Sequence, residues 1–85
     1  NIETLARTFN MSARNLRRRL KVEGTSFQKL KDKLRMEKAS SLLRDSRKQV
    51  SEISLQLGFQ EPAAFTRAFK SWTGLSPRAY RDKYS

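Results

Sequence analysis

The feature that most limits how this chain can fold is an internal repeat, because its two ends match when one is shifted along the other. Leu5 matches Ile53 at an offset of 48, and Leu16 matches Phe65 at an offset of 49. By Ser26 the offset has grown to 50. An offset that grows by one residue at each turn is expected when helices keep their register and the turns between them absorb single insertions. The chain is therefore interpreted as two copies of one small unit, joined by a connecting segment.

Both copies have the residue spacing of helices. Apolar side chains recur every three or four residues, and Gly, Asn or Pro separates the periodic segments. The predicted elements are a first helix-turn-helix over 2–22, a linker helix over 26–45, a second helix-turn-helix over 51–72 and a C-terminal helix over 76–84. No segment shows the alternation of a strand. We therefore predict an all-α fold in which two helix-turn-helix subdomains are joined by a long linker helix.

The turns and helix ends are also predicted from residue type. Asn10 is expected to end the first helix, because Asn tolerates the left-handed conformation of a tight turn. Ser12 is the expected N-cap of the second helix, Thr25 with Gln28 a capping box for the linker helix, and Ser51 the cap after it. The expected apolar faces consist of Ile2, Leu5, Ala6, Phe9, Leu16, Leu20, Phe27, Leu30, Leu34, Met36, Ala39, Leu42, Leu43, Ile53, Leu55, Leu57, Phe65, Ala68, Phe69 and Trp72.

Composition limits the chemistry of this chain. It has 19 Lys and Arg against 8 Asp and Glu, for a net charge of +11, so a polyanionic partner is expected. There is no Cys and no His, so disulfides, zinc fingers and imidazole bases are excluded, and no metal or cofactor is predicted. The acidic residues stand singly among basic neighbours, without the paired carboxylates of a catalytic site, and no enzyme activity is predicted.

The positive charge gathers on one face of the predicted second helix, opposite its leucines. That face carries Arg14, Arg17, Arg18 and Lys21, and the equivalent face of the second copy carries Ala63, Thr66, Arg67 and Lys70. A basic second helix is the element that helix-turn-helix proteins insert into the major groove of DNA. Ordinary solvation of an exposed face is the alternative, but the repeat and the absence of acidic residues over 12–22 favour DNA contact.

The length of the linker helix is compatible with two reading helices in adjacent grooves. A linker helix of about 20 residues is roughly 30 Å long, close to the roughly 34 Å between successive major grooves.

With these residues identified, the chain resembles the C-terminal DNA-binding domain of AraC/XylS-type transcription regulators over essentially its whole length. The strongest match is ISLQLGFQEPAAFTRAFKSWTGLSPRAYR over residues 53–81, and MSARNLRRRLKVEGTSF and LRMEKASSLL extend it through the first half. The resemblance implies a seven-helix fold of two homeodomain-like units, with the first helix of the seven missing here. It also implies binding to promoter DNA, usually with activation of transcription.

The resemblance further implies which residues face DNA. Base-facing positions fall on Arg14, Arg17 and Arg18 in the first unit, and on Pro62, Ala63, Thr66 and Arg67 in the second. The full predicted DNA-binding set is Ala13, Arg14, Arg17, Arg18, Lys21, Pro62, Ala63, Thr66, Arg67 and Lys70. Arginine can bind guanine with two hydrogen bonds, whereas the second helix offers few such donors, so the first unit is expected to supply most of the sequence specificity. Asn10 departs from the usual Gly and Ser54 from the usual Ala, and the Ser54 hydroxyl needs a partner.

Further expectations concern partners and compartment. The chain begins at Asn1, so we interpret it as a fragment whose effector-binding and dimerising parts lie upstream, with RNA polymerase as a possible partner of the whole protein. No membrane partner is predicted, and the expected location is the cytoplasm, in association with the nucleoid. A sequence-indifferent nucleic-acid binder, including an RNA binder, remains the main alternative, and a membrane-active basic helix is a weaker one.

Overall fold

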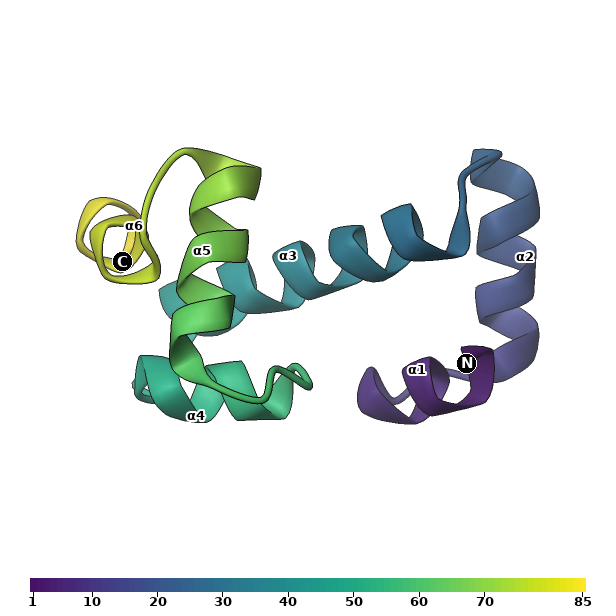
Figure 1. The fold of residues 1–85 in the computed structure, drawn as a ribbon, viewed down its shortest axis with the longest axis horizontal. Coiled ribbons are helices and arrows are strands. Elements are labelled where there is room, and N and C mark those ends of the chain that lie inside the picture. Colours follow the sequence, from purple (N-terminus) through teal and green to yellow (C-terminus); the bar gives the residue numbers. More distant parts are fainter. The chain divides into compact units, whose positions relative to one another are not determined.

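The computed structural model describes all 85 residues, which form six α-helices and no strand (Figure 1). The helices are α1 (Ile2–Thr8), α2 (Ala13–Glu23), α3 (Phe27–Asp45), α4 (Val50–Gln56), α5 (Pro62–Thr73) and α6 (Pro77–Tyr84). They belong to two compact units, residues 1–35 and residues 36–85, so α3 contributes its first part to one unit and the rest to the other. The predicted all-α fold class is confirmed. None of the six helices combines the length and the hydropathy needed to cross a membrane.

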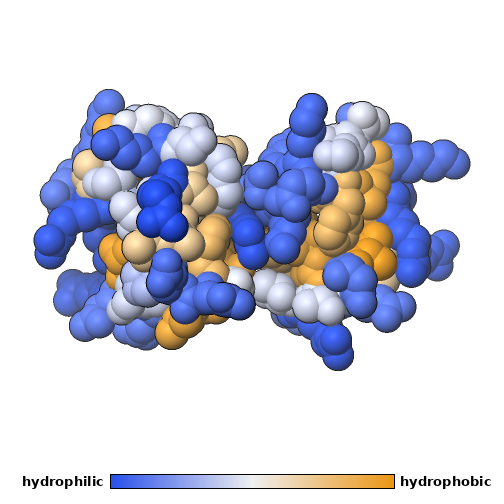
Figure 2. Space-filling view, viewed as in Figure 1, coloured by the Kyte–Doolittle hydropathy of each residue, from blue (hydrophilic) through white to orange (hydrophobic).

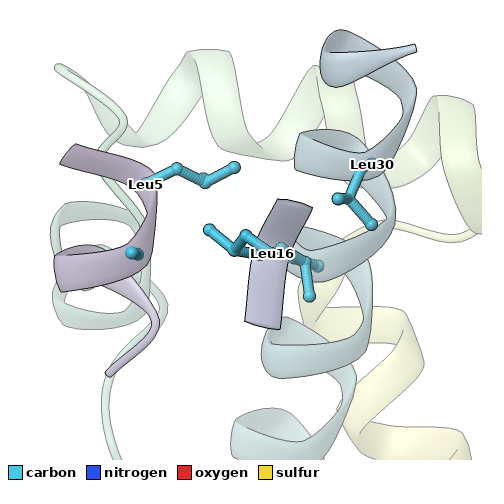
Figure 3. Close-up of a cluster of buried hydrophobic side chains, with 5 residues drawn as sticks. Leu5, Leu16 and Leu30 are labelled. Atoms are coloured by element: carbon cyan, nitrogen blue, oxygen red, sulfur yellow. The ribbon is translucent and has the colours of Figure 1, made fainter. Parts of the chain in front are cut away.

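The first unit is built around leucines from three helices. Leu5 of α1, Leu16 of α2 and Leu30 of α3 point toward one another (Figure 3), and Leu16 and Leu30 are completely buried. Further apolar side chains pack against this cluster while remaining partly exposed: Ile2, Phe9, Met11, Ala13, Leu20 and Phe27. On the face drawn in Figure 2, hydrophobic residues accordingly reach the surface among the hydrophilic ones. The first unit therefore has a small core with an incompletely covered edge.

The turn between α1 and α2 follows the prediction. Asn10 adopts a left-handed conformation with φ of 54°, which lets the chain reverse after α1. The Ser12 hydroxyl then accepts a hydrogen bond of 3.0 Å from the backbone N–H of Asn15, as an N-cap of α2 should. At the other end of α2, Gly24 is left-handed with φ of 60° and closes the helix. These contacts fix where α2 begins and ends.

The second unit has an aromatic core. Phe65 and Phe69 of α5 are completely buried, together with Ile53 of α4. The Phe69 ring packs edge-on against the Tyr80 ring of α6 at 5.2 Å between centroids, and Phe59 lies 5.5 Å from Phe65. Such tilted and edge-on pairs add to the stabilisation from burial. The prediction that Phe65 and Phe69 belong to the apolar face of this helix is confirmed.

Two of the predicted N-cap residues are wrong. α3 is capped by Ser26, whose hydroxyl accepts a 3.1 Å hydrogen bond from the Lys29 N–H, and not by Thr25. The Gln28 side chain donates instead to Asp32 within the helix, at 3.1 Å. Two hydroxyl residues stand side by side here, and Ser26 is the one that directly precedes the first helical residue, Phe27.

The α4 cap and one α4 core residue are also corrected. α4 begins at Val50, so Gln49 and not Ser51 precedes it, and the Gln49 N–H donates to the Glu52 carboxylate at 3.4 Å. Leu55, expected on the apolar face, is 63% exposed. A seven-residue helix has only one inward stripe, and Ile53 occupies it with its neighbours on that side. The apolar residues of α4 therefore cover more of the helix surface than the part that is buried.

Arg81 of α6 forms hydrogen bonds with backbone carbonyls at and just after the end of α3. Its Nε donates to the carbonyl of Leu43 at 3.0 Å, and its Nη2 donates to the carbonyls of Ser46 and Leu42 at 3.3 and 3.4 Å. The last carbonyls of a helix have no partner within the helix, and a cation is favoured at that end by the helix dipole. One guanidinium therefore closes α3 and holds the C-terminal helix in place.

Ser54 carries an unsatisfied polar group in the same unit. It is completely buried in α4, and its Oγ has no hydrogen-bond partner in the protein. The equivalent residue of the first unit, Ala6, is buried at 4% exposure without a polar group. The hydrogen-bond partner that we expected for the Ser54 hydroxyl is thus absent from the fold.

Candidate nucleic-acid interface

α2 presents a cationic face because its leucines hold the opposite face in the core. Leu16 is completely buried and Leu20 is partly buried. With those leucines turned inward, Arg14, Arg17 and Lys21 are exposed, as is Arg18. Ala13, which was predicted to contact DNA, is partly buried and packs against the leucine cluster, so only part of its surface is accessible.

These cations are not neutralised within the protein. Arg14, Arg17 and Lys21 form no ion pair and no side-chain hydrogen bond in the structure, and the single contact of Arg18 is a long 3.5 Å hydrogen bond to Asn15 Oδ1. Long side chains that project into water without a partner keep their rotamer freedom and their charge. They are available to an external anion at little energetic cost.

Arg19 has a different position from its neighbours in α2. Its Nε donates to Glu23 Oε2 at 2.8 Å, and the other oxygen of Glu23 accepts from Lys33 Nζ of α3, also at 2.8 Å. The hydrogen bonds from Lys33 and then Arg19 lower the pKa of the Glu23 carboxyl from its ordinary value. Glu23 thus links α2 to α3 inside the first unit and draws Arg19 away from the cationic face.

The sequence had not predicted this link. Arg19 and Glu23 stand four residues apart in one helix, a spacing at which side chains of opposite charge are neighbours, and that signal was available. The contact of Glu23 with Lys33, by contrast, joins two helices across a turn and depends on how α2 and α3 pack.

α5 presents the corresponding face of the second unit. Phe65 and Phe69 point into the core, and the opposite side carries exposed Ala63, Arg67 and Lys70. The remaining predicted residues of this helix are Pro62, which is exposed at the first helical position, and Thr66, which is partly buried. All five are on the accessible side of α5, but only two of them are charged, so this face is less cationic than that of α2.

The rest of the chain adds no metal site to these faces. Across the 85 residues, His, Cys, Asp and Glu side chains nowhere gather in threes as a metal site requires. Each unit thus offers an exposed helix face without a metal site. The face of the first unit is rich in guanidinium and ammonium groups, whereas that of the second unit combines charged and uncharged side chains.

This arrangement of helices matches known proteins. A family model described as a helix-turn-helix domain matches residues 5–83. The chain belongs to the AraC-type helix-turn-helix family. Members of this family are DNA-binding transcription regulators, and this AraC-type domain is accordingly not an enzyme.

Individual relatives agree with this assignment. The domain is 41% identical over 81 residues to the HTH-type transcriptional regulator VqsM of Pseudomonas aeruginosa, covering 95% of this chain and 25% of that protein. It is 36% identical over 76 residues to the HTH-type transcriptional activator CfaD of Escherichia coli, covering 89% of this chain and 29% of CfaD. This AraC-type chain thus spans about a quarter of the length of the curated relatives it matches.

A solved structure extends the comparison to a DNA complex. The DNA-binding domain of AdpA, a global transcriptional factor crystallised with a target DNA, is 34% identical, with a TM-score of 0.71. The match covers 99% of this AraC-type domain and 77% of the AdpA chain. The predicted fold of two helix-turn-helix subdomains joined by a linker helix is thereby confirmed.

Proposed function

We propose that this AraC-type domain binds specific double-stranded promoter DNA in bacteria by inserting α2 and α5 into the major groove. The observation that carries the proposal is the exposed face of α2, where Arg14, Arg17 and Lys21 project without any partner in the protein. A positive helix face of this kind in a helix-turn-helix matches the negative potential and the width of the major groove. The relative crystallised with a target DNA supports a duplex as the partner.

We propose that the two helices divide the work of recognition. Arg14, Arg17 and Arg18 are assigned to base edges, because a guanidinium can donate to O6 and N7 of guanine together. In α5, Ala63 and Thr66 suit thymine methyl groups, whereas Arg67 and Lys70 suit phosphates. Lys21, on the same face of α2 as the arginines, is assigned to a phosphate, and the remaining proposed contacts, from Ala13 and Pro62, lie at the edges of these faces. The first unit then supplies most of the sequence specificity and the second mainly anchors the complex.

A pair of substitutions tests this division. Selection of binding sites from random duplexes should yield a preferred sequence, and Arg17→Ala should relax one base position at a cost of about 1–3 kcal/mol against the correct base. Lys70→Ala should weaken all sequences alike and reduce the salt slope by about one unit. Arg7→Ala, an exposed arginine of α1 outside the proposed face, serves as the matched control and should leave the preferred sequence unchanged.

The selected sites also test the use of two grooves. The 19 residues of α3 correspond to a helix of about 28 Å, a length that suits reading helices in successive major grooves on one side of a duplex. We expect two protected boxes about one helical turn apart. A single protected box, or equal affinity for all sequences at matched salt, contradicts the proposal and favours a non-specific nucleic-acid binder.

We propose further roles only for the whole protein that contains this domain. Activation of transcription is supported by the name of CfaD, and contact with RNA polymerase follows from such a role. Effector binding and dimerisation are proposed for regions outside this chain, since the relatives it matches are about four times as long. A reporter driven by the selected site, with and without the whole protein, distinguishes activation from repression.

A further inference from the structure

A groove of about 570 Å³ lies between α4, α5 and α6 of the second unit, and no predicted function uses most of its residues. Its polar lining comes from all three helices. The lining includes Gln49 and Ser51 near the start of α4, Thr66 of α5, and Arg78, Arg81 and Asp82 of α6. The groove is therefore shared by the helix proposed to read DNA and by the C-terminal helix.

The two arginines of the groove differ in their freedom. Arg81 is held by three backbone carbonyls at the end of α3, so its positive charge has a fixed position in the wall. Arg78 is exposed and has neither an ion pair nor a hydrogen bond in the structure. One guanidinium thus provides a constant field, and the other is free to turn toward a ligand.

The remaining polar groups suit an anion of limited charge. Hydroxyl groups of Ser51 and Thr66 can donate to anionic oxygens, and arginine recognises phosphate with two parallel hydrogen bonds. The exposed Asp82 carboxylate repels an anion, so the lining carries two positive charges against one negative charge. A phosphodiester, with a single negative charge, fits this balance.

We propose that this groove holds a phosphate of the DNA backbone, next to the bases that face α5. The inference rests on the proposed function, and Thr66 provides the link because it belongs both to the groove and to the DNA-facing side of α5. Most hydrogen bonds between proteins and DNA go to phosphates and sugars and fix the register of the protein on the duplex. Arg78 is thereby assigned as the residue that anchors the second unit.

Salt dependence of binding tests the assignment of Arg78. Loss of one phosphate contact should reduce the slope of log K against log salt by about 0.9, so Arg78→Gln should show this change with roughly 3- to 10-fold weaker binding at low salt. The weakening should be equal for the preferred site and for unrelated duplexes. Asp82→Asn, which removes the repelling charge, should instead tighten binding.

Lys83→Gln is the matched control for this experiment. Lys83 is an exposed cation of the same helix, but it lies over the Tyr84 ring and does not line the groove. Its replacement should change the slope much less than Arg78→Gln does. An equal effect of the two substitutions would mean that only the general positive field matters, and it would overturn the proposal.

A scan with neutral methylphosphonate linkages identifies the phosphate itself. One linkage beside the bases read by α5 should weaken binding of the unaltered protein and have little further effect on the Arg78→Gln variant, because the two changes remove the same contact. If the protein prefers one sequence but no linkage couples to Arg78, the groove proposal fails while the proposed function stands. If there is no preferred sequence at all, the proposed function fails first.

A free phosphate group offers the same chemistry as the DNA backbone. Inorganic phosphate is therefore titrated into the DNA-free protein at constant ionic strength, with the Arg78 Nε–H signal followed by NMR. We expect no saturable shift in the low millimolar range, since the net charge of the groove is only +1 and its mobile cation, Arg78, is exposed to water. Saturable binding there would assign the groove to a small anionic ligand and overturn its assignment to DNA.

Discussion

Replacing Ser54 by alanine is expected to stabilise the second unit, although it removes a polar group from a DNA-binding domain. The Ser54 side chain is completely buried in α4, and its Oγ has no hydrogen-bond partner in the protein. A buried donor or acceptor without a partner costs about 1–3 kcal/mol. Alanine also has a better helix propensity than serine by a few tenths of a kcal/mol. Allowing for the lost packing of one oxygen atom, Ser54→Ala should raise the free energy of unfolding by about 1–2 kcal/mol.

The repeat provides a matched comparison for this substitution. Ala6 occupies the equivalent position in the first unit at 4% exposure, so Ala6→Ser introduces there the group that Ser54→Ala removes. We expect Ala6→Ser to destabilise the first unit by a similar amount. The two substitutions should therefore have opposite signs, which a general effect of serine or alanine on solubility does not produce.

Urea unfolding followed by Trp72 fluorescence measures the effect in the second unit. Trp72 is the one tryptophan of the chain and packs against Phe69 at 6.4 Å between ring centroids, so its emission reports on this core. Far-UV circular dichroism follows the helices of both units together, so the part of its transition that does not coincide with the Trp72 transition reports on the first unit. In thermal unfolding, each kcal/mol corresponds to a shift of about 4–8 °C in Tm for a domain of this size. If Ser54→Ala raises the free energy of unfolding by less than about 0.3 kcal/mol, or lowers it, the Ser54 hydroxyl has a hydrogen-bond partner in solution and the reasoning is refuted.

Two further predictions concern charged groups inside the units. Arg81→Met should lower the stability of the second unit by about 2–4 kcal/mol in the Trp72 assay, because the Leu43 and Ser46 carbonyls lose the donor that Arg81 supplies, whereas Leu42 keeps its hydrogen bonds from Ser46. Arg81→Lys should recover only part of this stability. In the first unit, the pKa of Glu23 is lowered by its hydrogen bonds from Lys33 and Arg19, so its ion pairs should contribute fully above pH 4.5 and be lost as the pH falls through the lowered pKa. The free energy of unfolding of the Glu23→Gln variant and of the unaltered protein is measured by circular dichroism at several pH values. The difference between the two should shrink as the pH falls below 4.5, and a difference that does not change with pH would contradict the lowered pKa.

Much of the local structure followed from the sequence, because local signals act over a few residues. Asn10 and Ser12 were identified as the turn and the cap between α1 and α2, since a left-handed conformation and an N-cap each favour a small set of side chains. The periodic leucines and aromatics were sufficient to define which side of α2 and α5 is buried. The exposed cationic face of α2 then followed, since side chains opposite a buried stripe must face water.

Errors and omissions arose where one local pattern allowed two outcomes. Thr25 and Ser26 were both candidates to cap α3, and Ser26, which directly precedes Phe27, forms the capping hydrogen bond. Leu55 has the apolar character of a core residue, but the short helix α4 packs along one stripe only and leaves it 63% exposed. For Leu55 the outcome depended on how α4 packs in the second unit, which its own seven residues do not specify.

By itself, the sequence determined a duplicated, all-helical and strongly basic protein with one cationic helix face, since periodicity, capping preference and charge are properties of neighbouring residues. Only the tertiary structure decided that Arg81 closes α3, that Glu23 joins α2 to Lys33, and that the Ser54 hydroxyl is left without a partner. These contacts join helices or depend on the packing around a buried atom. They are set by the way the helices pack in three dimensions, which no spacing along the chain specifies.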